Sequence, residues 1–282
     1  ARSLAVDVGN SRIKFGLFAT PEDCVKRAGA GGLPIAAATL RGPTESVALS
    51  VPSIASGELS DWLERVGAAA PTVAIASVCP PSEEVVVGAV NASPEPMMLT
   101  ARDAPIEVHL DEPERVGIDR LVAAAAANRL RREATPAIVI DIGTAITVDL
   151  LSGDGAFQGG AILPGPTLAG NALAERTALL PEVHPGELDA SPDAVGVETE
   201  TAMLAGIFWA TVGALRELIA RQRDRLTKAP QVFLTGGASP AFARLIGGAD
   251  YTVRYVPDLT LSGVALAAEH ARTRRATTVS RP

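Results

Sequence analysis

Short apolar runs separated by polar turns dominate this sequence, and two of the runs share one pattern. Residues 4–18 read LAVDVGNSRIKFGLF, and residues 137–151 read AIVIDIGTAITVDLL. Each segment predicts a buried strand, a turn of the form Asp-x-Gly-polar and a second buried strand. The turns begin at Asp7 and Asp141, which lie 134 residues apart, about half of the chain. Such a repeat at half length indicates a duplicated domain.

Strand patterns alternate with helical patterns along the rest of the chain, so the sequence predicts an α/β protein. The patterns predict helices over 60–69, 82–91, 120–132, 166–180, 199–226 and 262–273, and strands over 73–78, 156–163 and 232–234. Ser60 and Ser82 are the expected N-caps of the first two helices. We place the domain boundary beside the Ala-rich third helix, which gives domains 1–115 and 116–282. The basic residues 272–275 are expected to be solvated and frayed.

Composition and charge exclude several classes of protein. The chain has 282 residues, 47 % of them apolar and 20 % charged, as in a globular protein with room for two domains. The net charge of −7 argues against nucleic-acid or acidic-membrane binding, which needs a basic face. The longest apolar stretch, residues 202–215, ends at Arg216 and predicts a buried helix rather than a membrane span. Cys24 and Cys79 match no metal-site spacing and follow no signal peptide, so we expect reduced thiols in a cytoplasmic protein.

The first Asp-x-Gly turn has the residue types of a phosphate-binding loop. Gly9 lets the backbone approach a ligand closely, and Asn10 and Ser11 add side-chain donors. Lys14 can return to the same end of the strand pair with a positive charge. An ionised Asp7 at the end of an apolar run is unfavourable without a partner. Mg²⁺ that accompanies a nucleotide is a suitable partner, because this ion is usually bound by one or two carboxylates, phosphates and water.

Two further features are open to a structural and a functional interpretation. Asp119, in the stretch Val116-Gly-Ile-Asp-Arg120, is either the N-cap of the Ala-rich helix or a general base reached by a substrate hydroxyl. Thr235-Gly-Gly-Ala238 follows a predicted strand. It is either a structural turn or, beside two phosphate-type loops, a wall near the adenosine or ribose of a nucleotide.

Six stretches of the sequence together resemble the type III pantothenate kinases over essentially the whole chain. They are, in this order, DVGNSRIKFGLF, VGIDRLVAAAAA, DIGTAITVDLL, GGAILPG, TALLP and TGGA. The resemblance implies two duplicated ribonuclease-H-like domains of the actin-like ATPase type, with a nucleotide cleft between them. It also implies a homodimer that phosphorylates pantothenate with Mg-ATP, in the first step of coenzyme A biosynthesis.

The resemblance also implies roles for single residues. The implied ATP-binding residues are Asp7, Gly9, Asn10, Ser11, Lys14 and Thr144, with Asp7 holding Mg²⁺ through water. Asp141 would bind a monovalent cation, potassium or ammonium, and Asp119 would accept the proton of the pantothenate hydroxyl. The implied pantothenate site consists of Leu110, Gly117, Ile118, Asp119, Arg120 and Thr199. In the family this threonine reaches the pantothenate of the partner subunit, so the substrate site lies at the subunit interface.

The sequence departs from the family pattern in one place that concerns the acceptor. The family usually reads Tyr-x-Asn-Pro where this chain reads Leu110-Asp-Glu-Pro113. Leu110 has no phenol hydroxyl, and Glu112 replaces the asparagine. Two alternatives therefore stay open, a kinase for another small hydroxyl acceptor and a non-catalytic regulatory relative. The acidic residues at positions 7, 119 and 141 favour a kinase, because a scaffold has no need of them.

Overall fold

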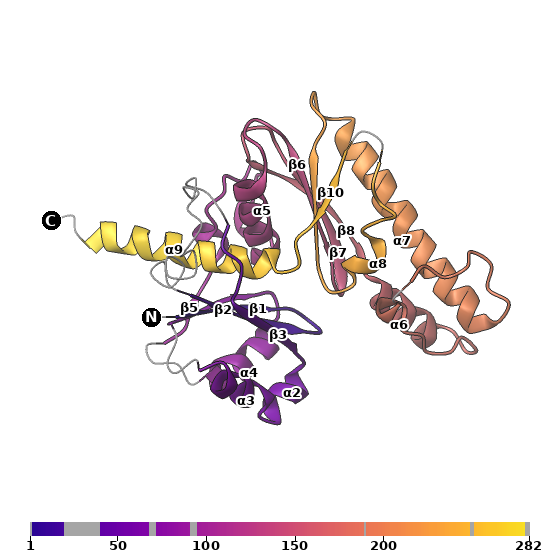
Figure 1. The fold of residues 1–282 in the computed structure, drawn as a ribbon, viewed down its shortest axis with the longest axis horizontal. Helices are drawn as coiled ribbons and strands as arrows, with labels where there is room; N and C mark the ends of the chain where they lie inside the picture. The colour runs from indigo at the N-terminus through magenta and orange to yellow at the C-terminus, as the bar shows by residue number, and fades with distance from the viewer. Residues whose placement is uncertain are drawn as a thin grey trace, which may run out of the picture. The chain divides into compact units, whose positions relative to one another are not determined.

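The structure is a computed structural model that describes residues 2–19, 40–67, 72–90, 95–188, 190–248 and 251–279. The chain divides into two compact units. The first unit comprises Ala1–Leu130 and Asp258–Pro282, and the second comprises Arg131–Pro257. Each unit contains one five-stranded sheet with helices around it (Figure 1).

The sheet of the first unit has the strand order β3-β2-β1-β4-β5. Its strands are β1 (Ser3–Val8), β2 (Ile13–Phe18), β3 (Glu45–Leu49), β4 (Thr72–Ser77) and β5 (Met97–Met98). Strands β1, β2 and β3 pair in antiparallel fashion, and β4 and β5 run parallel to β1. Leu4, Val6 and Val8 alternate into one buried cluster. Asp7, between the last two, therefore points to the opposite face of the sheet.

Helices cover both faces of this first sheet. They are α2 (Val51–Ala55), α3 (Glu58–Arg65), α4 (Pro80–Val90), α5 (Ile118–Leu130) and α9 (Leu259–Val279), with 3₁₀ turns η1 (Ala101–Asp103) and η2 (Pro113–Arg115). Figure 1 shows α9 on one side of the sheet and α2, α3 and α4 on the other. A Cβ atom at Gly263 of α9 would collide with the carbonyl of Val122 in α5. The absence of a side chain there lets α9 pack closely on the Ala-rich α5.

The sheet of the second unit repeats the first. Its order is β10-β9-β6-β7-β8, which read from the other end matches the order of the first sheet. The strands are β6 (Ala137–Ile142), β7 (Ala145–Leu151), β8 (Phe157–Pro164), β9 (Gln231–Thr235) and β10 (Val253–Tyr255). The first three are antiparallel neighbours, and the last two run parallel to β6. The predicted duplication and the predicted α/β fold class are therefore confirmed.

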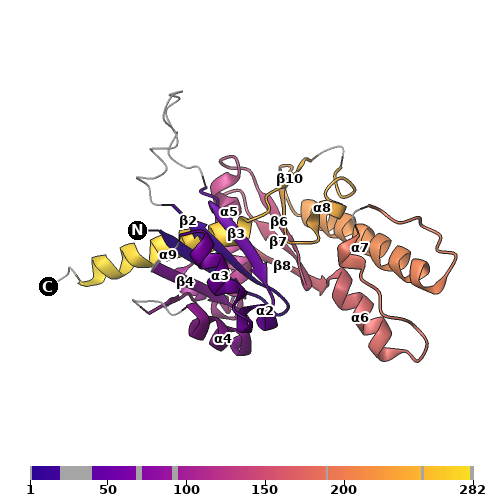
Figure 2. The same cartoon turned by 60° about the horizontal axis from the view of Figure 1, so that its bottom comes forward.

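The helices of the second unit are α6 (Pro166–Arg176), α7 (Thr199–Arg223) and α8 (Ser239–Phe242), with the 3₁₀ turn η3 (Pro185–Glu187). Phe208, Val212 and Leu215 of α7 join the buried cluster of the sheet. The ring of Phe208 stacks on that of Phe242 at 4.8 Å between centroids. Figure 2 shows the same helices after a 60° rotation.

Helix α7 has a buried face and an apolar face that the unit leaves uncovered. By length and composition it could cross a membrane, and 44 % of its most apolar 18-residue window is buried. It is the helix that the sequence analysis interpreted as a core helix. Apolar core helices of soluble proteins meet the same length and composition criterion.

Several predicted element ends differ from the structure. Helix α3 begins at Glu58 with Gly57 as its N-cap, so the prediction of Ser60 as cap is wrong. Helix α4 begins two residues before Ser82, whose hydroxyl instead hydrogen-bonds Cys79 Sγ at 3.2 Å. The pattern at Ser82 missed the start of α4, because Pro80 and Pro81 already fit the first turn of a helix.

The compact units also differ from the expected domains 1–115 and 116–282. Helix α5 packs against α9 and β4, and α9 packs against β1, β2 and β4, so both helices belong to the first unit. The residues expected to form a frayed basic end are part of α9. Arg272 donates to Thr72 Oγ1 at 3.2 Å, and Arg274 donates to the carbonyl of Arg102. Cys24 lies outside the described residues.

Candidate functional site

The phosphate-type loop of the first unit joins β1 to β2. Gly9 N–H donates to the carbonyl of Arg12 at 3.3 Å, which closes the turn, and Asn10 and Ser11 are exposed at its tip. Asp7 and Lys14 face each other in the β1–β2 register. Their charged atoms, Lys14 Nζ and Asp7 Oδ2, are 3.7 Å apart. Asp7 is only 7 % exposed, so the lysine is a charge partner for a carboxylate that is nearly buried.

The second candidate cluster of the first unit is the turn that enters α5. Helix α5 begins at Ile118, which is buried, and Asp119 and Arg120 are half-buried in its first turn. Asp119 is therefore not the N-cap. Its Oδ1 accepts a hydrogen bond from Arg120 N–H at 2.8 Å, in the turn where a helix favours negative charge. A Cβ atom at Gly117 would lie 2.5 Å from this same Oδ1, so a side chain at position 117 would require the Asp119 carboxylate to move.

Val78, a residue that the sequence analysis did not single out, lies next to both clusters. Its N–H donates to the carbonyl of Val8 at 3.1 Å, at the end of β1 where the phosphate-type loop begins. Its Cγ1 is 3.6 Å from the position that a Cβ of Gly117 would occupy. The half-buried Val78 thus brings the end of β1 and the start of α5 together. The predicted strand that ends at residue 78 was the signal in the sequence that could have identified Val78, because parallel neighbouring strands end at the same edge of a sheet.

Cys79 follows Val78 and has a perturbed thiol. The side-chain and backbone hydrogen bonds of Ser82 lower the pKa of Cys79 below its ordinary value. A hydrogen bond to a thiolate favours the charged form, which is the cause of this shift. The thiol is half-buried at the start of α4.

Two glycines, Gly165 and Gly236, pack closely against the Asp141 loop of the second unit. In the register of the parallel strands β6 and β9, Asp141 pairs with Thr235, the first residue of the Thr-Gly-Gly-Ala turn. Gly236 has φ +102°, and a Cβ there would lie 2.5 Å from both Asp141 Oδ1 and the Ile142 carbonyl. Gly165 N–H donates to the carbonyl of Thr144 at 2.9 Å. The structure therefore brings the Asp141–Thr144 turn and the Thr-Gly-Gly-Ala turn together.

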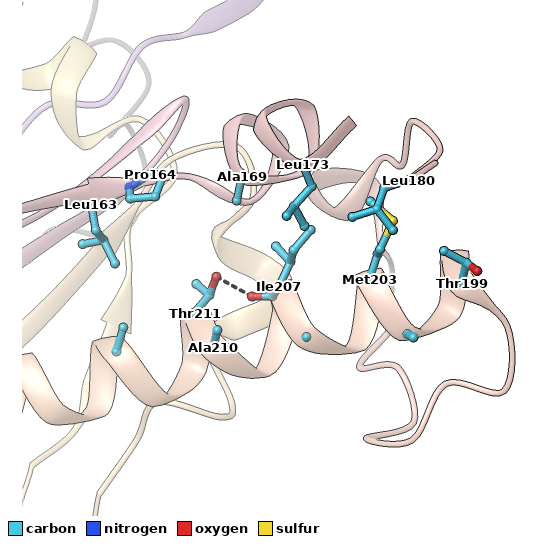
Figure 3. Close-up of a pocket in the computed structure, with 13 residues that line it drawn as sticks. Leu163, Pro164, Ala169, Leu173, Leu180, Thr199, Met203, Ile207, Ala210 and Thr211 are labelled. Carbon is cyan, nitrogen blue, oxygen red and sulfur yellow. Dashed lines mark hydrogen bonds between the residues drawn. The ribbon is translucent and has the colours of Figure 1, made fainter. Parts of the chain in front are cut away.

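Thr199 is the first residue of α7 and lies at the end of an apolar groove (Figure 3). The groove has a volume of about 680 Å³ and runs between α6 and α7. Leu173 of α6 points toward Ile207 of α7, and Leu180 lies beside Met203 (Figure 3). Thr199 is exposed at the rim.

The segment around Leu110 is exposed. Leu110 itself is 39 % exposed, and Glu112 forms an ion pair with Arg115 in which Oε2 and Nη1 are 2.6 Å apart. Both charged side chains of this pair are mostly in solvent, so the pair contributes little to stability. Leu110 places an apolar surface where the resemblance expects a phenol.

The family model and the relatives compared with this chain indicate the same family. A family model described as type III pantothenate kinase matches residues 3–221. A type III pantothenate kinase of Gluconobacter oxydans (strain 621H) is 39 % identical over 175 residues, which is 62 % of each chain. The matched part is thus less than two thirds of that relative's length. A type III pantothenate kinase of Dehalococcoides mccartyi (strain CBDB1) is 32 % identical over 269 residues, 93 % of each chain.

Solved structures support the fold. The activator of 2-hydroxyisocaproyl-CoA dehydratase from Clostridium difficile, solved with ADPNP, has a TM-score of 0.52 at 14 % identity. The alignment covers 100 % of this chain and 99 % of that one. A putative 2-dehydro-3-deoxygalactonokinase from Sinorhizobium meliloti has a TM-score of 0.51 at 15 % identity, over 95 % and 99 % of the chains. At these identities the likeness concerns the fold alone.

Proposed function

Because this chain belongs to the type III pantothenate kinase family, we propose that it transfers the γ-phosphoryl group of ATP to the hydroxyl of pantothenate. The reaction would be the first step of coenzyme A biosynthesis, in the cytoplasm. One observation carries the proposal. The end of β1, where the phosphate-type loop begins, and the start of α5 are both adjacent to Val78, so a phosphate donor and a hydroxyl acceptor could meet there.

In this reaction the loop would bind the phosphates of ATP. The backbone N–H groups near Gly9, the side chains of Asn10 and Ser11, and the Lys14 ammonium are suitable donors. Asp7 fits Mg²⁺ because it is an oxygen ligand beside the proposed phosphate site, the kind of donor that Mg²⁺ takes together with phosphates and water. When bound, this ion would neutralise negative charge on the phosphates.

Asp119 is the proposed proton acceptor. Its Oδ1 accepts from Arg120 N–H at 2.8 Å, which orients the carboxylate at the start of α5. A positioned general base contributes about 10²–10⁴-fold in rate. The guanidinium of Arg120 would hold the carboxylate of pantothenate, since guanidinium groups match carboxylate geometry. Gly117 and Ile118 would line the same acceptor site.

In the second unit, we propose that Asp141 binds a potassium or ammonium ion and that Thr144 contacts ATP. Asp141 supplies a half-buried carboxylate beside backbone carbonyls, a suitable oxygen set for a monovalent cation. The Thr-Gly-Gly-Ala turn against it would contact the nucleotide. These assignments rest on the resemblance and on the close packing of the two turns.

We further propose a homodimer through the uncovered face of α7. The groove of Figure 3 is an apolar surface on the second unit. Burial of such a surface against a second copy is favourable. In this dimer Thr199 would reach pantothenate bound to the other subunit.

The dimer is tested by the molar mass of the protein in solution, from light scattering coupled to gel filtration. Ala210→Arg places a charge in the groove, and we expect it to give monomers. Ala220→Arg is the matched control, because Ala220 is an exposed alanine of the same helix outside the groove. A monomeric wild-type protein would overturn the dimer.

The kinase activity is tested by ADP release from Mg-ATP, with and without pantothenate, in sodium or potassium salts. We expect turnover that requires pantothenate and is increased by potassium. Asp119→Asn should bind ATP and lose about 10²–10⁴-fold in kcat. Asp61→Asn is the matched control, since Asp61 occupies the first turn of α3 as Asp119 occupies that of α5.

A kinase for another small hydroxyl acceptor stays as a second candidate, because Leu110 lacks the phenol hydroxyl of the family's usual tyrosine. ATP binding and turnover with another small alcohol, but none with pantothenate, would assign the chain to that class. ATP binding without turnover for any acceptor would support a regulatory relative. Near-wild-type turnover of Asp119→Asn would refute the role of that residue.

A further inference from the structure

The phosphate-type loop contains a charged residue, Arg12, that has no role in the site described so far. Arg12 lies opposite Gly9, whose N–H donates to the carbonyl of Arg12 at 3.3 Å. Its side chain is exposed. Within the described part of the chain, this side chain makes no ion pair and no hydrogen bond. The loop therefore ends in a cation that the fold itself does not use.

Strand geometry puts Arg12 on the same face of the sheet as Lys14. Ile13, between the two, joins the buried cluster on one face. Lys14 lies opposite Asp7 in the β1–β2 register, and the charged atoms of that pair are 3.7 Å apart. Alternate residues of an extended chain point to the same side, so the guanidinium of Arg12 and the ammonium of Lys14 start about 7 Å apart on one face. Both side chains are long enough to contact one chain of phosphates.

The charge balance of the loop also favours a role for Arg12. Residues 7–14 contain one acid, Asp7, and two cations, Arg12 and Lys14. Because Lys14 is a charge partner of Asp7, these two charges largely offset each other. Arg12 supplies the positive charge that remains. Mg-ATP keeps a net negative charge after the ion is bound, so a loop with this excess attracts it.

The duplicated hairpin of the second unit shows that the turn itself does not need this cation. Asp141 faces Thr147 in the β6–β7 register. This second turn is one residue shorter than the Asp7–Lys14 turn, and it contains no lysine or arginine. The same strand pair thus forms without a basic residue, which favours a ligand-binding role for Arg12 over a structural one.

We propose that Arg12 is a further phosphate-binding residue, and that it holds the part of the phosphate chain that remains on ADP. Strand β2 lies on one side of β1, and β4 lies on the other. Val78 follows β4 and lies next to Gly117 at the acceptor turn. Two strand spacings, roughly 10 Å, therefore separate Arg12 from the side on which the acceptor would bind. A guanidinium group suits this contact because it binds phosphate oxygens in a bidentate manner.

This inference rests on the proposed nucleotide site, and calorimetric titration with ADP tests it whether or not pantothenate is the acceptor. Arg12→Gln should weaken ADP binding by about 10-fold or more, as expected for the loss of a hydrogen bond between charged groups. Arg12→Lys should recover part of the affinity, because lysine keeps the charge but not the bidentate geometry. Arg65→Gln is the matched control and should bind ADP as the wild type does, because Arg65 is an exposed arginine at the end of α3.

Two further measurements separate binding from other roles. Both Arg12 variants should unfold at the wild-type temperature; weaker binding together with a lower Tm would assign Arg12 to the fold instead. In steady-state kinetics, Arg12→Gln should raise the KM for ATP with little change in kcat, because a contact to the part that remains on ADP is made equally before and during transfer. A lower kcat at unchanged KM overturns the assignment to that part.

The failure of this inference and that of the proposed function are distinguishable. Unchanged ADP affinity in Arg12→Gln overturns the role of Arg12 and leaves the proposed nucleotide site in place. No binding of ADP or ATP by the wild-type protein overturns both proposals.

Discussion

Replacement of Gly236 by alanine gives the sharpest test of how the second unit holds its Asp141 loop. Gly236 has φ +102°, a conformation that side chains rarely adopt, and its would-be Cβ meets a crowded site. The added methyl would lie 2.5 Å from Asp141 Oδ1 and from the Ile142 carbonyl, and 2.6 Å from Ile142 N. Two of these three atoms belong to the backbone, which cannot move away as a flexible side chain would.

The expected loss of stability has two parts. A left-handed conformation costs an L-residue about 1–2 kcal/mol. Crowding by an extra methyl group in a well-packed site costs about 1–3 kcal/mol more. Together, these give a decrease of about 2–5 kcal/mol in the free energy of unfolding. In a protein of this size, that decrease lowers Tm by roughly 5–15 °C.

Two other glycines separate these contributions. Gly57 has a similar φ of +98°, with no atom within 4 Å of its would-be Cβ, so Gly57→Ala should show the conformational cost alone. Gly213 lies inside α7, outside the groove, with open space and no positive φ, so Gly213→Ala should stabilise by about 0.5–1 kcal/mol. Calorimetry and urea unfolding of the three variants measure the differences. A Gly236→Ala variant no less stable than Gly57→Ala would refute the proposed crowding of the Asp141 loop.

Two further predictions concern the first unit. Ser82→Ala, made in a Cys24→Ser background, removes the hydroxyl that lowers the pKa of Cys79. The pH at which alkylation of Cys79 by iodoacetamide reaches half its maximal rate should therefore rise. An unchanged pH profile would contradict the assigned cause of the pKa shift. If pantothenate is the acceptor, Leu110→Tyr should lower its KM by about 5-fold with little change in kcat, as expected for one gained hydrogen bond of about 1 kcal/mol. An unchanged KM would show that position 110 does not contact the acceptor.

The duplication could be predicted from the sequence because its signal is local. The apolar alternation and the Asp-x-Gly turns at Asp7 and Asp141 specify a strand pair in each half, and both occur in the structure as antiparallel pairs. The placement of Lys14 opposite Asp7 follows from the same alternation, since a tight turn sets the register of the two strands.

The arrangement of helices within the first unit depends on residues that are distant in the sequence, so no local pattern predicts it. The unit to which α5 belongs is decided by α9, whose Gly263 meets Val122 across some 140 positions of sequence that no local pattern connects. The nearness of Val78 to both Val8 and Gly117 likewise arises only when strands and helices pack together. Propensity and periodicity describe single elements, and tertiary packing decides which of them meet.

The discontinuous first unit has a consequence for synthesis of the chain. Helix α9, which packs on β1, β2, β4 and α5, leaves the ribosome only after the whole of Arg131–Pro257. The second unit is one continuous segment and can fold first, as domains generally do during translation. Meanwhile the nascent first unit exposes the apolar surface that α9 later covers. We therefore expect the first unit to complete its packing only after α9 has left the ribosome.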